Sequence, residues 1–318
     1  MQTYLKTKPV WIQLLLFLGM AFGLFIVLSF IGVAILSKIT GISIFELQDT
    51  AKWNAANPNM IVFIRGMLVI QFLGLFLIPS LLFAYFSDPH PLDFAGLKAP
   101  KNSLYWVLGI MAMVVAIPIV EYTGMLNQHM TFGGETQRWM KSMEDDAARQ
   151  IQFMLNKHTP GELILNLIFI SLFAGIGEEL FFRGILQRLM IRAFKSPWLG
   201  IAVTALLFSG FHLQFFGFIP RFLLGMLLGA IYWYSGSLWT AIIAHFIYDG
   251  LIIVLAYMNP EMIKNPNASM INPANMTGMA LVSAVLTVVL ILQMKRKSTT
   301  SFAEIYKNDK PPTDEFTF

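Results

Sequence analysis

The sequence predicts an all-α membrane protein, a polytopic bundle of about eight transmembrane helices with a polar cluster in its later helices. Hydrophobic residues make up 56% of the 318-residue chain and charged residues only 13%, about half the charge content of a soluble domain. Apolar runs of about 18 or more residues, long enough to cross a hydrocarbon layer, recur along most of the sequence. A soluble α/β enzyme would show neither feature.

Eight apolar runs give the expected spans. They cover residues 10–37, 60–86, 103–125, 161–190, 198–213, 219–234, 237–258 and 276–294. The first follows Lys6 and Lys8 but is too long for a secretory signal and lacks a clear cleavage site, so we expect a permanent helix. The fifth and sixth are short. We expect them to tilt little, to lie where the bilayer is thinned, or to be shielded partly by protein.

The basic residues predict the orientation of the chain. With eight spans, both termini lie on one side, and that side would carry twelve of the 22 Lys and Arg residues against nine elsewhere, with the membrane-buried Arg183 counted in neither group. Because basic residues favour the cytoplasmic side of a membrane, we expect both termini in the cytoplasm.

The remaining segments are polar. Residues 127–160 mix acidic side chains with apolar ones such as Trp139 and Phe153, which is typical of an amphipathic helix at the membrane interface. The last residues are predicted to be a disordered tail. The net charge of +4 does not indicate a nucleic-acid partner, because Lys and Arg are scattered between the apolar runs. The sequence contains no cysteine, so a metal ligand would have to be His, Glu, Asp or Asn.

The fourth run carries three charges within six residues, Glu178, Glu179 and Arg183. Ionisable groups at membrane depth are costly, so their presence indicates a function or a buried network. At about 100° per residue, Glu179 and Arg183 lie about 40° apart on one helix face, which predicts a salt bridge between them. Glu178 points about 140° away from Arg183 and is the candidate general base. The alternatives are a purely stabilising ion-pair network and the interfacial end of a helix.

Two later runs carry histidines. His212 follows Phe208 by one turn, and His245 and Asp249 are spaced to share one helix face. Each feature alone is compatible with helix packing. Together with Glu178 they place catalytic-type groups on three of the later runs, the fourth, fifth and seventh, which favours a site. Gly225 and Gly229 in the sixth run predict close helix contact around it.

Three motifs in this order resemble those of the CPBP family of intramembrane proteases, also called Abi, which includes the type II CAAX prenyl endopeptidases. The motifs are Glu178-Glu179-x-x-x-Arg183, Phe208-x-x-x-His212 and His245-x-x-x-Asp249. The resemblance covers about residues 160–255. Other protease types fit less well, because the sequence has no His-Glu-x-x-His motif and neither Ser209 nor Ser237 has a Gly-x-Ser-x-Gly setting.

The resemblance implies a role for each motif residue. Glu178 would activate water, Glu179 and Arg183 would brace the site, and His212, His245 and Asp249 would complete it. Two mechanisms stay open. In the first, Zn²⁺ is held by a subset of Glu178, His212, His245 and Asp249 and activates a bound water. In the second, without a metal, Glu178 and His212 activate water directly and His245 stabilises the oxyanion.

The expected function is therefore an intramembrane endopeptidase that cleaves a membrane-associated protein or peptide, prenylated or not, in what the resemblance suggests is a bacterial cytoplasmic membrane. The alternatives are a non-catalytic scaffold or immunity protein, and an ion- or proton-coupled transporter. A transporter predicts inverted repeats, which the sequence does not show. The expected units are residues 1–158, the first helices with the polar insertion; 159–258, the catalytic core; and 259–318, the last helix and a cytoplasmic tail.

Overall fold

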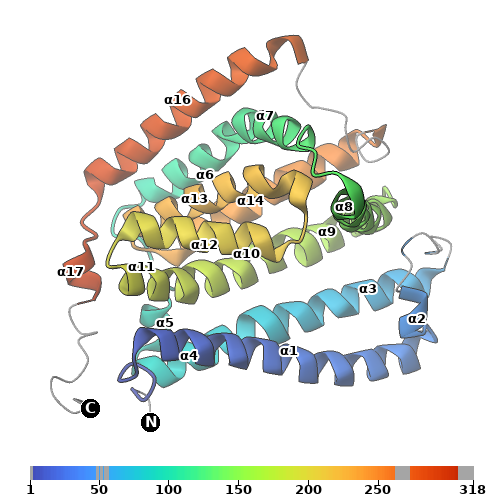
Figure 1. The fold of residues 1–318 in the computed structure, drawn as a ribbon, viewed down its shortest axis with the longest axis horizontal. Coiled ribbons are helices and arrows are strands. Elements are labelled where there is room, and N and C mark those ends of the chain that lie inside the picture. The colour runs from blue at the N-terminus through green and yellow to red at the C-terminus, as the bar shows by residue number, and fades with distance from the viewer. Residues whose placement is uncertain (1–2, 48–49, 51–52, 54–56, 262–272, 307–318) are drawn as a thin grey trace.

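The computed structural model describes residues 3–47, 50, 53, 57–261 and 273–306 of the chain. Within these ranges the regular structure is helical and no strand occurs, which confirms the predicted all-α class (Figure 1). Seven helical segments are long and apolar enough to cross a membrane, and a shorter apolar helix, α12 (Pro197–Phe211), matches the expected fifth span. The chain is an integral, multi-pass membrane protein. Helical segments thus coincide with the eight expected spans to within a few residues, and seven of them are long enough to cross.

The first two spans are α1 (Val10–Thr40) and the series α3 (Pro58–Gln71), η2 (Phe72–Leu77) and α4 (Ile78–Ser87), with the short α2 (Ile44–Leu47) between them. A short α5 (Pro91–Phe94) precedes the third span, which consists of α6 (Leu104–Val115) and α7 (Ile117–Gln128). The polar insertion contains α8 (Gly134–Leu155), so the predicted helix is present there. Its position at a membrane interface stays a prediction.

The fourth span is a series of α9 (Pro160–Asn166), η3 (Leu167–Leu172), α10 (Phe173–Glu178), η4 (Glu179–Gln187) and α11 (Arg188–Phe194). After α12 and the turn η5 (Phe215–Gly217) come α13 (Phe218–Ser235), α14 (Leu238–Met258), α16 (Pro273–Lys297) and α17 (Phe302–Ile305). The segments η2, η3 and η4 are π-helical. Turns of this kind are rare and often mark functional sites.

Local sequence explains where several helices begin and end. Asn57, Thr159 and Ser196 each accept a backbone N–H bond at a helix N-terminus, and a proline follows each of them. Gly41 and Gly236 end α1 and α13 in the left-handed conformation, which glycine adopts without steric cost.

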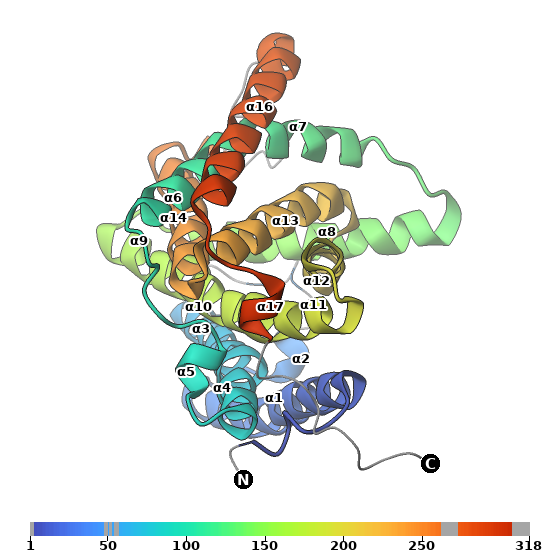
Figure 2. The same ribbon diagram turned by 90° about the vertical axis from the view of Figure 1, so that its left-hand side faces the viewer.

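The bundle is layered. The α1 helix packs against α3, η2 and α4, while α14 packs against α6, α13 and the π-helical fourth span (Figure 2). A cluster of buried aromatic side chains joins the first layer to the fourth span, with Phe17, Phe83, Phe181 and Phe182 at most 1% exposed. The α16 helix lies on the outside against α6, α7 and α13. The segment η4, in which every residue is buried, and α14 are thus well enclosed by protein.

The predicted close approach of the sixth span is confirmed. A Cβ atom added at Gly225 would lie 3.0 Å from Ala205 Cβ in α12, and one added at Gly229 would lie 2.7 Å from Ile201 Cγ2 in the same helix. The two glycines therefore allow α13 to pack directly on α12. This contact positions His212, the residue that follows α12, beside the fourth span.

Candidate active site

A buried ion pair forms the base of the site. Glu179 and Arg183 are both fully buried, and Arg183 Nη1 donates to Glu179 Oε1 at 2.6 Å. The guanidinium also donates through Nη2 to the Gly225 carbonyl at 3.3 Å and lies 4.4 Å from the centre of the Phe208 ring. The predicted pair is confirmed, although it lies in the π-helical η4 and not in the α-helix that the angular estimate assumed. Arg183 therefore ties η4 to both α12 and α13.

His245 links this pair to α14. Its Nδ1 lies 2.8 Å from Glu179 Oε1, so one carboxylate oxygen serves both Arg183 and His245. Its Nε2 lies 3.2 Å from Asp249 Oδ2, as the spacing of four residues predicted. Each of its two ring nitrogens therefore faces a carboxylate oxygen, one from the fourth span and one from its own helix. His245 is thus held in place by Glu179 on one side and Asp249 on the other.

His212 approaches from the end of α12 and is half-buried. Its Nδ1 lies 2.8 Å from the Phe208 carbonyl oxygen, which can only accept. The Nδ1 atom therefore carries a proton, and in the neutral ring Nε2 keeps a free lone pair. His212 is suited to accept a proton or to orient a water molecule through that atom.

Glu178 is the last residue of α10 and is half-buried. It lies close enough to His212, His245, Asp249 and Glu179 to interact electrostatically with each of them. The six residues selected from the sequence therefore come from the fourth span, the end of α12 and α14 and gather in one cluster. Their individual catalytic roles stay predictions.

The cluster does not form a ready metal site. Among the residues that the structure describes, no group of three or more His, Asp or Glu side chains is placed to hold a metal ion. Both ring nitrogens of His245 face carboxylates, and His212 Nδ1 faces a carbonyl. The donor set predicted for Zn²⁺ would therefore have to rearrange before these side chains could hold the ion.

The two serines near the histidines have other partners. The Ser209 hydroxyl donates to the Phe218 carbonyl at 2.6 Å, and the Ser237 hydroxyl donates to the Lys98 carbonyl. Each hydroxyl thus joins two segments of the chain, and neither is activated by an imidazole in this arrangement.

One cation near the site was missed in the sequence. Arg221, in the first turn of α13, interacts electrostatically with Glu178, Asp249 and Glu144 and donates to the Gln214 side chain. Burial raises the pKa of Glu144 in α8, and the charge of Arg221 partly offsets this effect. Residues 144 and 221 are far apart in the sequence, so no local motif indicates the contact.

A second largely buried ion pair was also missed. Arg65 in α3 pairs with Glu162 in α9 and donates to Asn166 Oδ1 at 3.2 Å. Each residue is a single charge near the end of an apolar run, where an interfacial position is the simpler expectation. This pair joins the second span to the start of the fourth.

Comparison with known proteins bears on the same segment. Residues 160–251 match the family model described as type II CAAX prenyl endopeptidase Rce1-like. The chain is also similar to the uncharacterized protein YpbD of Bacillus subtilis (strain 168), with 30% identity over 92 residues that cover 28% of this chain and 44% of YpbD. The match thus spans less than half the length of this curated relative. No solved structure gives a significant match. The family resemblance predicted from the motifs is confirmed for the segment that carries them.

Proposed function

Starting from the similarity of residues 160–251 to CAAX-type intramembrane endopeptidases, we propose that this chain hydrolyses a peptide bond in a membrane-associated protein or peptide, with Glu178 as the general base. The main support is that some residues of the cluster are fixed by hydrogen bonds while others beside them are available to a substrate. Glu179, Arg183 and His245 are held in a buried network by bonds of 2.6 and 2.8 Å. Among the residues that the structure describes, Glu178 and Nε2 of His212 make no comparable hydrogen bond, and both stand beside this network.

The proposed reaction begins with a water molecule between Glu178 and His212. Glu178 takes a proton from the water as its oxygen attacks the carbonyl carbon of the substrate, while His212 Nε2 orients the water. His245, donating a hydrogen bond, stabilises the negative charge on the former carbonyl oxygen. Protonated Glu178 then gives its proton to the leaving amine as the C–N bond breaks, which restores the carboxylate.

Glu179 and Arg183 are positioning residues in this scheme. Glu179 fixes Nδ1 of His245 and so directs Nε2 toward Asp249. Arg183 holds the Glu179 carboxylate in place from within η4. A side chain locked by its neighbours can present a proton donor without rearrangement during the reaction.

The test is cleavage of a membrane-peptide library by the purified protein in lipid vesicles. We expect Glu178→Gln to lower kcat by about 10²–10⁴-fold, the usual contribution of a general base. Glu135→Gln, which changes a carboxylate that is 96% exposed in α8, should leave kcat unchanged. An unchanged unfolding midpoint in Glu178→Gln would show that the loss is chemical.

Two outcomes would overturn the proposal. If the folded wild-type protein cleaves no peptide across a broad library, a scaffold or a transporter becomes the better interpretation. If Glu178→Gln keeps wild-type turnover, another group is the base. A parallel assay with a strong chelator, followed by added Zn²⁺, decides between the metal-free scheme and the zinc alternative: activity that is lost and then restored would establish the zinc mechanism.

A further inference from the structure

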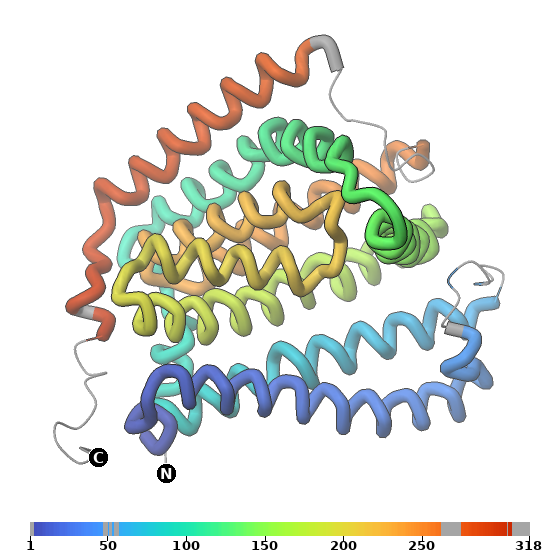
Figure 3. Tube along the Cα trace, viewed as in Figure 1, coloured from blue at the N-terminus to red at the C-terminus, as the bar shows by residue number. Residues whose placement is uncertain are grey.

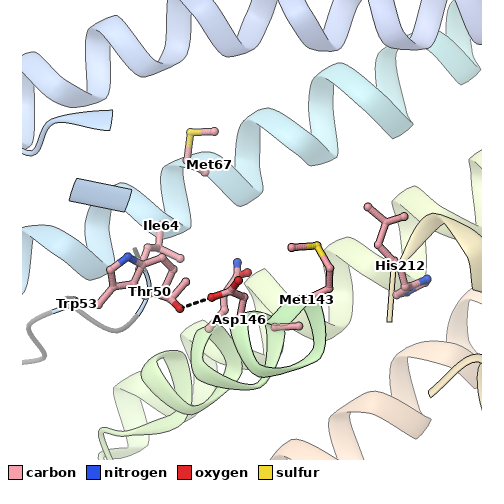
Figure 4. A pocket seen from close by; sticks show the side chains of 10 residues that line it. Thr50, Trp53, Ile64, Met67, Met143, Asp146 and His212 are labelled. Atoms are coloured by element: carbon pink, nitrogen blue, oxygen red, sulfur yellow. Dashed lines mark hydrogen bonds between the residues drawn. The ribbon is translucent and has the colours of Figure 1, made fainter. Parts of the chain in front are cut away.

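A cavity of about 380 Å³ adjoins the candidate active site (Figure 4). It lies between α3 and α8, with His212 at one end and Trp53 at the other. Ile64 and Met67 line it from α3, and Met143 lines it from α8. This volume lies within the range of ordinary ligand pockets, which is about 300–1,000 Å³. Any molecule that fills the cavity would touch the proposed catalytic histidine.

A polar triad of Thr50, Asp146 and Arg149 fixes the α8 side of this cavity. The Thr50 hydroxyl donates to Asp146 Oδ1 at 2.6 Å, and Arg149 donates to the same carboxylate oxygen at 2.8 Å and to the Thr50 hydroxyl at 2.7 Å. The charges of Asp146 and Arg149 offset each other, so the triad adds little net charge to the cavity. Its main effect is to hold α8 against Thr50.

Most of the cavity wall comes from outside the family-matched segment. Of the ten lining residues, only His212 and Leu213 fall within residues 160–251. The catalytic motifs therefore belong to the shared segment, while the adjoining wall belongs to parts of the chain that the family model does not cover. A wall of this origin can give the chain a selectivity of its own.

We propose that this cavity binds the part of the peptide substrate that adjoins the scissile bond, and that it selects large, uncharged apolar side chains there. The inference rests on the proposed function and deepens it. Trp53, Ile64, Met67 and Met143 provide an apolar surface, and an unpaired charge buried against them would be costly. Methionine side chains adapt to different shapes, so we expect tolerance among Leu, Phe, Ile and Met.

Because the sequence contains no cysteine, a single introduced thiol can report whether a peptide occupies the cavity. In a Glu178→Ala background, which binds without cleaving, Met143→Cys introduces a single thiol in the cavity wall. Ser142→Cys introduces a nearly isosteric thiol at an exposed neighbouring position as a matched control. The labelling rate with a maleimide is measured in lipid vesicles with peptides of one length that carry Leu-Phe, Ser-Gly or Asp-Lys at two central positions.

We expect the Leu-Phe peptide to slow labelling of Met143→Cys about tenfold at a concentration ten times its Kd, as competition by mass action requires. The other two peptides should have little effect, and Ser142→Cys should label at the same rate throughout. Met67→Cys on the facing helix should follow Met143→Cys. In the catalytically intact protein, Met143→Trp should lower cleavage of the Leu-Phe peptide more than cleavage of the Ser-Gly peptide.

The outcomes separate this inference from the proposed function. Cleavage by the wild-type protein without protection of Met143→Cys would overturn the cavity assignment and leave the endopeptidase standing. Protection without cleavage would support the cavity and count against the enzyme. Equal protection by all three peptides, or protection by lipid alone with no effect of peptide, would contradict the proposed selectivity.

Discussion

The buried Arg183 offers a quantitative test of what holds the site together. Replacing it with methionine keeps a long unbranched side chain but removes the partner of a fully buried carboxylate. Breaking a buried pair in this way costs about 3–5 kcal/mol. Glu179 would keep its hydrogen bond from His245, which places the expected loss near the lower end, about 3 kcal/mol. Loss of the contact with the Phe208 ring adds about 1 kcal/mol.

The assay is the free energy of unfolding, measured by denaturant titration in mixed micelles. Arg138→Met is the control, because its ion pair with Glu135 is exposed and 3.7 Å long, and such pairs contribute about 0–1 kcal/mol. The double variant Glu179→Gln/Arg183→Met should be less destabilised than the two single variants added together, by about 1 kcal/mol or more. Its turnover should stay low, because His245 has lost the carboxylate that positions it.

Two results would refute this reasoning. One is an Arg183→Met protein within about 1 kcal/mol of the wild type, which would mean that the pair contributes no more than a surface contact. The other is strict additivity in the cycle, which would mean that the two residues act independently.

Three further predictions follow from particular contacts. Ser209→Ala should keep kcat/KM within about twofold and lower stability by about 1 kcal/mol, because its hydroxyl donates to a backbone carbonyl; a loss of activity beyond about 10²-fold would instead indicate a serine nucleophile. Gly229→Ala should lower the free energy of unfolding by about 1–3 kcal/mol, because its Cβ would lie 2.7 Å from atoms of two neighbouring side chains. The control Gly23→Ala should not lower it, because no neighbouring atom lies within 4 Å of the added Cβ. Equal unfolding free energies for the two variants would contradict the close packing at Gly229. The pKa of Asp146 is held below its ordinary value of 3.8 by hydrogen bonds, first from Thr50. Its contribution to stability is therefore present above pH 3.8 and is lost as the pH falls through the lower folded-state pKa. Asp146→Asn should therefore reduce the fall of the unfolding midpoint between pH 6 and pH 2.5. An unchanged pH dependence of the midpoint would count against the triad.

Much of the fold could be predicted because lipid imposes a strong rule on sequence. Backbone groups in hydrocarbon must be paired within a helix, so each apolar run of sufficient length indicates a span. The contacts of Glu179 with Arg183, and of His245 with Asp249, could also be predicted, because each spans only four residues. The order of the three motifs then indicated that their helices meet.

Other features depend on contacts that sequence spacing does not encode. The π-helical turns of η4 shift every following side chain around the helix axis, and no residue type specifies them. Arg221 reaches the site by a turn between α12 and α13, and Glu144 reaches Arg221 from a separate polar helix. The wall of the cavity comes from residues near 50, 65 and 145, which the chain brings beside His212 only in the folded bundle.

The short helix α12 has a consequence for where substrates come from. It begins near the end of the bundle that holds the start of α1 and α17, and it delivers His212 toward the opposite end, where α2 and α8 lie (Figures 1 and 3). If both termini are cytoplasmic, as the basic residues predict, the end of α12 that carries His212 lies toward the outer face of the membrane. Exported peptides and the outward segments of membrane proteins would then reach the catalytic cluster directly, whereas lipid-modified proteins confined to the cytoplasm would have to cross the bilayer first.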